Sequence, residues 1–81
     1  MPEVSKEEIL KALALCRDAL GEKRVRGLRI SDDWGHGITL AVLLLQNPGD
    51  RHYESGLEDP QTREWVFQAI RSIQQEQLAQ A

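Results

Sequence analysis

Residues 24–45 decide the fold that the sequence predicts, and they read RVRGLRI (24–30), SDDWGHG (31–37) and ITLAVLLL (38–45). The last run is the most apolar in the chain and contains no charge, glycine or proline. A short apolar run without a helix cap is more typical of a β-strand than of a helix. The turn formers of 31–37 would join it to a more polar strand. The stretch therefore predicts an antiparallel β-hairpin.

Both faces of the predicted second strand are apolar. Side chains alternate between the two faces of a strand, so one face would carry Ile38, Leu40, Val42 and Leu44. Such a strand is expected to be covered on both sides. Two helices packed on one side of a hairpin leave the other side bare, and a second copy of the chain is the simplest cover. We therefore expect a homodimer, edge to edge or face to face, whose self-association surface consists of Thr39, Ala41, Leu43 and Leu45.

The helix before the hairpin has clear boundaries. Ser5 and Glu8 form a capping box, which predicts a helix that begins at Lys6, and Gly21 is suited to end it. The apolar stripe between them has helical spacing and consists of Ile9, Leu10, Leu13, Cys16, Ala19 and Leu20. Because Cys16 lies within this stripe, we expect a buried core thiol rather than a reactive one.

A second helix is predicted after the hairpin. Asp59 and Pro60 have the N-cap and first-turn arrangement that opens a helix. Its apolar face consists of Trp65, Val66, Ala69, Ile70 and Ile73, with Phe67 beside them. The glutamine-rich end, residues 75–81, offers little to bury and should fray. Residues 1–81 are thus predicted to form one α+β domain with two layers in the order α-β-β-α, and dimerisation would complete its sheet.

Length and composition narrow the class of protein. The 81 residues, 41% of them hydrophobic, suffice for one small core. The single cysteine and the absence of a hydrophobic leader after Met1 predict a cytoplasmic protein. No apolar run approaches the ~20 residues needed to span a bilayer, so no membrane association is expected.

The charge distribution leaves one alternative open. A net charge of −3 argues against nucleic-acid binding, yet one short stretch is basic and contains Lys23, Arg24, Arg26 and Arg29. These residues could decorate an edge strand. The alternative is that they follow a phosphate backbone, with Trp34 as a platform on which bases stack.

The longest polar stretch, residues 46–58, is predicted to be a loop that begins with the turn Asn47-Pro48-Gly49-Asp50. Long loops inside compact domains are either functional sites or plain connectors. Together with the turn at 31–37, this loop supplies the candidates for contact with a protein partner, which are Trp34, His36, Arg51, His52 and Tyr53.

A catalytic or metal centre is not predicted. The acidic and imidazole side chains of the two loops could gather as ligands, but Asp32, Asp33, His36, Asp50 and His52 show no recognised ligand spacing. Phosphate-binding, redox and metalloprotease motifs are all missing from the chain. We therefore expect no enzyme activity, no cofactor and no metal.

The runs VSKEEILKAL (4–13) and LRISDDWGHGITLAVLLLQNPG (28–49) resemble the small domains related to iron–sulfur assembly factors, which run helix, strand, strand, loop, helix. That family's acidic-Pro-Glu turn after the first helix is replaced here by residues 17–21, and its cysteine after the second strand is replaced by Asp50. No functional residue is carried over. The sequence predicts a small, non-catalytic and homodimeric protein–protein interaction module, with a nucleic-acid-binding domain as the alternative.

Overall fold

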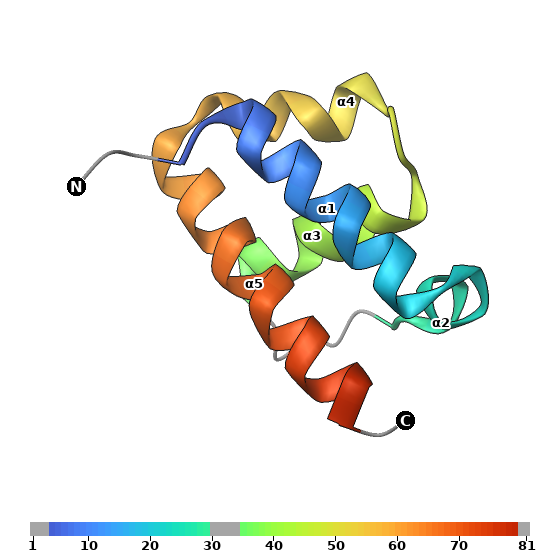
Figure 1. The fold of residues 1–81 in the computed structure, drawn as a ribbon. Helices are drawn as coiled ribbons and strands as arrows, with labels where there is room; N and C mark the ends of the chain where they lie inside the picture. The colour runs from blue at the N-terminus through green and yellow to red at the C-terminus, as the bar shows by residue number, and fades with distance from the viewer. Residues whose placement is uncertain (1–3, 30–34, 80–81) are drawn as a thin grey trace.

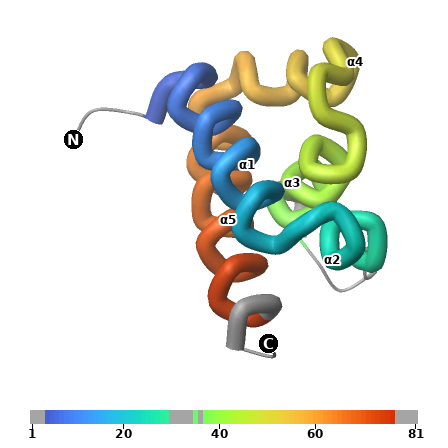
Figure 2. Tube along the Cα trace, turned by 45° about the vertical axis from the view of Figure 1, so that its right-hand side comes forward, coloured from blue at the N-terminus to red at the C-terminus, as the bar shows by residue number. Residues whose placement is uncertain are grey.

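The computed structural model describes residues 4–29 and 35–79, and helices make up nearly all of this part of the chain (Figure 1). In chain order the elements are α1 (Lys6–Leu20), α2 (Glu22–Gly27), α3 (His36–Gln46), α4 (Arg51–Glu54), the 3-10 turn η1 (Ser55–Glu58) and α5 (Pro60–Ala79). Helices α1 and α5 lie side by side, while α4 and η1 cross one end of them (Figures 1 and 2).

The predicted α+β fold is wrong, because the described residues contain no β-strand. The apolar run 38–45 lies inside α3, and the first half of the expected partner strand, residues 24–27, belongs to α2. A helix that is apolar on all sides is a buried helix, and α3 contacts α1, α2, α4 and α5. The run shows no alternation of apolar and polar residues because the neighbouring helices bury five of its eight residues and half-bury the other three.

The cover that a second copy was expected to supply comes from the chain's own helices. Ala41 and Leu45 are 0% and 1% exposed, and Thr39 and Leu43 are half-buried. These four residues wind around α3 and do not share a strand face. An uncovered sheet face is therefore no longer a reason to expect a homodimer.

The predicted ends of α1 are confirmed. The Glu8 N–H donates to Ser5 Oγ at 3.1 Å, and the Ser5 N–H donates to Glu8 Oε1 at 3.4 Å, so both halves of the capping box form. At the other end Gly21 has φ +86° and ψ 156°, a conformation that side chains with a Cβ rarely adopt. The buried stripe of α1 consists of Ile9, Leu13, Cys16 and Leu20.

The predicted start of α5 is also confirmed. Asp59 caps the helix by accepting hydrogen bonds from the Thr62 N–H at 3.0 Å and the Thr62 hydroxyl at 2.8 Å. These bonds hold the pKa of Asp59 below its ordinary value of 3.8. The helix continues to Ala79, through most of the segment expected to fray. Its buried residues include Val66, Ala69, Ile70 and Ile73.

The segment expected to be a long polar loop contains α4 and η1. The predicted turn is present, with Gly49 at φ +82°, and Asp50 then caps α4 by accepting the Tyr53 N–H at 3.2 Å. Leu57 in η1 is completely buried. The Asp50 cap begins α4, and the segment then packs onto the core through Leu57, with Tyr53 partly buried beside it.

Two side chains, Arg63 and Lys6, connect η1 and the start of α5 with the N-terminal end of α1. Arg63 Nε donates to the Val4 carbonyl at 2.8 Å, and Arg63 Nη1 donates to the Leu57 carbonyl at 2.7 Å. Lys6 Nζ lies 2.7 Å from Glu58 Oε1, and this ion pair raises the pKa of Lys6 and lowers that of Glu58. Exposed pairs of this kind add little to stability. The hydrogen bonds from the charged guanidinium of Arg63 to backbone carbonyls contribute more than the Lys6–Glu58 ion pair.

Candidate functional site

A groove runs between α5, the start of α3 and the end of α2, and we call it the α3–α5 groove. It consists of two adjoining hollows that share Ile38 and Ser72, with volumes of about 400 Å³ and 260 Å³. The larger hollow is lined by Gly35, Gly37, Ile38, Trp65, Gln68, Ala69 and Ser72. The smaller one is lined by Gly27, Leu28, Arg29, Ile38, Ser72, Ile73 and Glu76.

The groove lies where two glycines flank His36, the first residue of α3. A Cβ on Gly37 would lie 2.6 Å from Trp65 Cβ and 2.7 Å from the Trp65 carbonyl carbon and oxygen. The backbone of α3 therefore rests directly on that of α5 at this crossing, and the pair makes the most extensive contact between helices. Such a close approach requires glycine. Neighbouring Gly35 leaves open space beside the crossing.

Trp65 stands at the lip of the larger hollow. It is 45% exposed, whereas its neighbour Val66 is fully buried. One helical residue rotates the side chain by about 100°, so Trp65 lies at the edge of the apolar face of α5. Along the same helix, Gln68 and Ser72 give the groove a polar side.

Charged side chains mark the far end of the groove. Arg29 follows α2 and Glu76 lies in the last turns of α5, and both are exposed while lining the smaller hollow. Neither forms an ion pair within the part of the chain that the structure describes. The groove thus has an aromatic end at Trp65 and an end that carries one charge of each sign.

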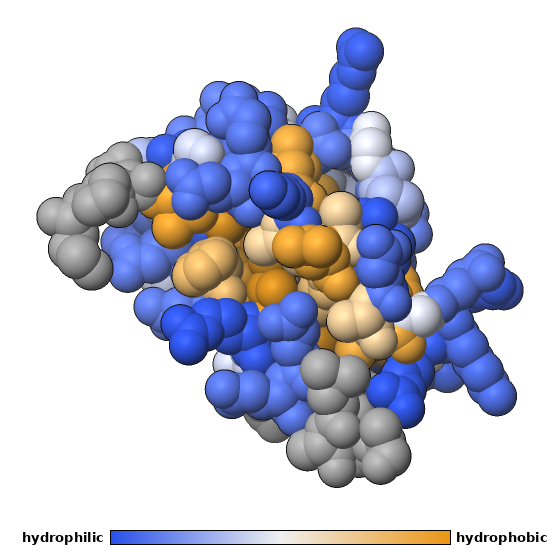
Figure 3. Space-filling view, viewed as in Figure 1, coloured by the Kyte–Doolittle hydropathy of each residue, from blue (hydrophilic) through white to orange (hydrophobic). Residues whose placement is uncertain are grey.

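A second apolar surface lies on another face. Figure 3 shows apolar side chains gathered over α1 and α5. Leu15 of α1 is 58% exposed, and Ala12 and Phe67 are partly buried against the core. Helix α1 contributes no residue to either hollow of the α3–α5 groove. Leu15 is therefore a natural comparison for Trp65, because both are large exposed apolar side chains on helices.

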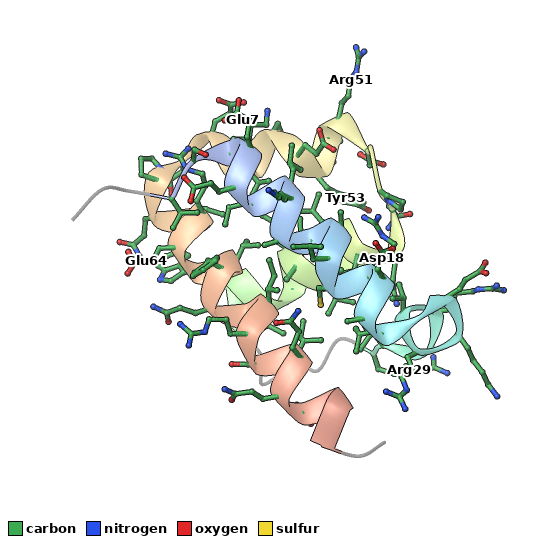
Figure 4. All side chains as sticks on the ribbon, viewed as in Figure 1. Glu7, Asp18, Arg29, Arg51, Tyr53 and Glu64 are labelled. Atoms are coloured by element: carbon green, nitrogen blue, oxygen red, sulfur yellow. The ribbon has the colours of Figure 1, made fainter. Side chains whose placement is uncertain are left out.

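The residues predicted to contact a partner do not gather at the groove. Arg51 and His52 are exposed on α4, and Arg51 points away from the body of the molecule (Figure 4). Tyr53 is half-buried, and its ring lies 5.6 Å from that of His52. His36 begins α3 next to the groove, but its side chain and the whole of Trp34 lie outside the described residues. Helix α4 contributes nothing to either hollow.

The basic residues of the alternative prediction lie on and after α2 rather than on a strand. Lys23, Arg26 and Arg29 are exposed, and Arg24 is half-buried. Arg26 pairs with Glu22 one turn away, which neutralises part of the cluster. Figure 4 places Arg29 at the end of the molecule away from Glu7 and Glu64.

Helix α2 is short, and one side chain from α3 binds its C-terminal end. Gln46 Nε2 donates to the carbonyls of Val25 at 3.1 Å and Leu28 at 2.9 Å, and the Val25 carbonyl also accepts the Leu28 N–H at 3.2 Å. Arg17 Nε donates to the Leu45 carbonyl at 3.3 Å and joins α1 to the end of α3. The two bonds from Gln46 fix the α2 end of the groove.

The described residues contain no group of three histidine, cysteine or acidic side chains that could hold a metal ion. Asp32 and Asp33, two of the ligands considered from the sequence, lie outside them. Cys16 is fully buried, and burial raises the pKa of its thiol. Within the same part of the chain, no helix has the length and apolar character needed to cross a membrane.

Sequence reasoning assigned Trp65 to the apolar core face of its helix and so missed its position at a groove. The buried residues of α5 form a stripe that leaves Trp65 at its edge, and they are Thr62, Val66, Ala69, Ile70 and Ile73. The sequence holds a signal for this position, because the residues three, seven and eleven positions after Trp65 are the polar Gln68, Ser72 and Glu76. The glycines at 35 and 37 were interpreted as turn residues. Their place at a helix crossing depends on which helix they meet.

No protein-family model matches the chain, and no curated protein or solved structure matches it either. The resemblance to the iron–sulfur assembly domains required two consecutive strands. Residues 38–45 form a helix instead, so the fold which that resemblance implied is corrected.

Proposed function

We propose that this protein is a protein–protein interaction module that binds through the α3–α5 groove. The observation that carries the proposal is Trp65, a tryptophan 45% exposed at the lip of a hollow of about 400 Å³. Tryptophan is among the residues most enriched at the energetic centres of protein interfaces. Concave apolar sites with a few polar groups are the usual form of binding sites, and Gln68 and Ser72 supply such groups.

The groove is well suited to binding because its walls are rigid. The backbone of Gly37 is in direct contact with Trp65, and Ala69 and Ile73 are buried beside the hollows. Helix positions held by core packing lose little conformational freedom when a partner binds. An apolar side chain of a partner, placed in the larger hollow against Trp65, would be removed from water at little cost in ordering this protein.

The proposal is tested by selecting peptides that bind the immobilised protein from a random displayed library. Peptides that use the groove should bind Trp65→Ala at least about tenfold more weakly than the parent, as expected for an aromatic hot spot. Leu15→Ala is the matched control, because it also removes an exposed apolar side chain but lies on α1. Binding would be measured by titration calorimetry, with circular dichroism to confirm that both variants fold.

Selected peptides that bind Trp65→Ala as tightly as the parent would contradict the proposal. The same holds if Leu15→Ala weakens binding and Trp65→Ala does not, because the interaction surface would then be the α1 face.

A nucleic-acid interface at α2 is the second candidate. Residues 17–29 contain five basic and two acidic side chains in a chain whose net charge is negative. Single-stranded and duplex oligonucleotides would then bind with an affinity that falls steeply as salt rises. Lys23→Ala should reduce the salt dependence, since each lost phosphate contact lowers its slope by about 1. Absence of binding at low salt would eliminate this candidate.

A further inference from the structure

We infer that the occupant of the α3–α5 groove is the same groove of a second copy of the chain, in a twofold-symmetric dimer. This inference rests on the proposed function and names the partner. It differs from the dimer expected from the sequence, because the surface is now formed by α5, the start of α3 and the end of α2. Residues 39, 41, 43 and 45 have no part in it, because none of them lines the groove.

The two charged residues of the groove, Arg29 and Glu76, have opposite signs, so the groove is electrostatically complementary to the same groove of a second copy. In a twofold interface, if residue i contacts residue j of the partner, then j also contacts i of the partner. Arg29 lines the smaller hollow from the end of α2 and Glu76 lines it from α5, and each is exposed and without an ion pair within the described residues. A second copy would place Arg29 against the partner's Glu76 and Glu76 against the partner's Arg29. The dimer then contains two new ion pairs.

This pairing defines the direction of the symmetry axis. Arg29 and Glu76 lie at one end of the groove and Trp65 at the other. Arg29 can reach the partner's Glu76 only if the charged end of one groove lies against the charged end of the other. The twofold axis must therefore run along the groove, with the two α5 helices side by side and parallel. An axis perpendicular to the groove would bring the charged end of one copy against the aromatic end of the other.

The same arrangement places Trp65 against the larger hollow of the partner. With like ends together, each Trp65 faces the partner's larger hollow, where Gly35 and Gly37 provide no side chain and Ile38 and Ala69 provide apolar contact. A volume of about 400 Å³ lies within the range that holds a drug-sized group, so it accommodates an indole. Trp65 acts as the protruding group and the glycine-lined hollow as its receptor, twice in each dimer.

The size of the chain favours such an association. A domain of 81 residues with a free, buried cysteine has a single small core and no cross-link. Association with a second copy adds buried apolar surface to such a domain and stabilises it by mass action.

The test reverses the charge of Arg29 or of Glu76 and measures dimerisation by sedimentation velocity across a dilution series. The parent chain should dimerise with a dissociation constant at or below about 10 µM. Arg29→Glu and Glu76→Arg should each raise that constant at least about tenfold, because either change sets like charges against each other twice. An equimolar mixture of the two variants restores both opposite-charge contacts and should form a heterodimer. The double variant should dimerise like the parent.

Trp65→Lys should also abolish the dimer, while Leu15→Lys, the same change on the α1 face, should leave it intact. Circular dichroism checks that these variants fold. If Trp65→Lys does not fold, Arg29→Glu and Glu76→Arg still test the inference. A parent that stays monomeric up to about 1 mM would overturn the inference. So would single charge variants that dimerise like the parent, a mixture no tighter than either variant alone, or a dimer lost in Leu15→Lys.

Failure of this inference is distinguishable from failure of the proposed function. A monomeric parent that selects Trp65-dependent peptides would overturn only the second copy as occupant. Selected peptides that do not depend on Trp65, together with a dimer that Trp65→Lys leaves unchanged, would overturn both.

Discussion

Replacing Gly37 by alanine should destabilise the protein even though alanine favours helices more than glycine does. The new methyl carbon would lie 2.6 Å from Trp65 Cβ and 2.7 Å from the Trp65 carbonyl carbon and oxygen. Backbone atoms cannot move aside as the end of a flexible side chain can. Ordinary contacts of a Cβ begin at 3.4 Å, so reaching them would require α3 and α5 to separate by about 0.8 Å at their crossing.

The magnitude follows from two opposing terms. Overpacking of a well-packed core costs about 1–3 kcal/mol, and a gap of this size forfeits a quarter to a half of the local dispersion energy. The gain in helix propensity is at most about 1 kcal/mol. We expect Gly37→Ala to lower the free energy of unfolding by about 1–2 kcal/mol. For a domain of this length that corresponds to a fall in Tm of about 5–15 °C.

Thermal and urea unfolding followed by circular dichroism would measure the effect. Gly27→Ala is the matched control, because Gly27 ends α2 and a Cβ there meets nothing within 4 Å. It should change stability by no more than about 0.5 kcal/mol. If Gly37→Ala is as stable as the parent or as Gly27→Ala, the close contact of the two backbones is refuted. The rigid wall of the α3–α5 groove would be refuted with it.

Three further predictions concern the ends of the helices. Gly21→Ala should cost about 1–3 kcal/mol in chemical denaturation, since its φ of +86° is strained for any residue with a Cβ; a neutral effect would contradict that conformation. Gln46→Glu removes the donor to two carbonyls at the end of α2, so it should lower the free energy of unfolding by about 1–3 kcal/mol. It should also speed hydrogen exchange of the α2 amides, and unchanged exchange would show that α2 does not depend on Gln46. Asp59→Asn should lower the Tm at neutral pH. The folded pKa of Asp59 is depressed, so the stability it adds is present above its ordinary pKa of 3.8 and is lost as pH falls through the lower folded value. The difference from the parent should therefore shrink below pH 3.8, and a constant difference would refute the cap as its source.

The ends of the two long helices could be predicted because their signals are local. Ser5 and Glu8 satisfy each other's backbone N–H groups within one turn, and Asp59 does the same for the first turn of α5. Such bonds depend only on residues three or four positions apart. The same is true of Gly21, whose positive φ follows from its position after the last turn of α1.

Much of the binding surface could not be predicted, because it depends on contacts between residues far apart in the chain. Gly37 and Trp65 are separated by 28 positions, and nothing near either one indicates that their backbones touch. Arg29 and Glu76 lie farther apart still and meet at one hollow only because α2 and α5 converge there. Arg51 and His52 were predicted to contact a partner because they belong to a long polar stretch, but they lie on α4, away from this groove.

By itself the sequence determined where α1 begins and ends, where α5 begins and that the run 38–45 is buried. It did not determine whether that run is a helix or a strand. An amphipathic element reveals its period because one side meets water, but a run that is apolar at nearly every position reveals none. The choice was made by packing, since α1, α2, α4 and α5 surround Ala41 and Leu45 and leave no side for a sheet partner. Tertiary structure thus decided both the all-helical fold of the described residues and the groove beside Trp65.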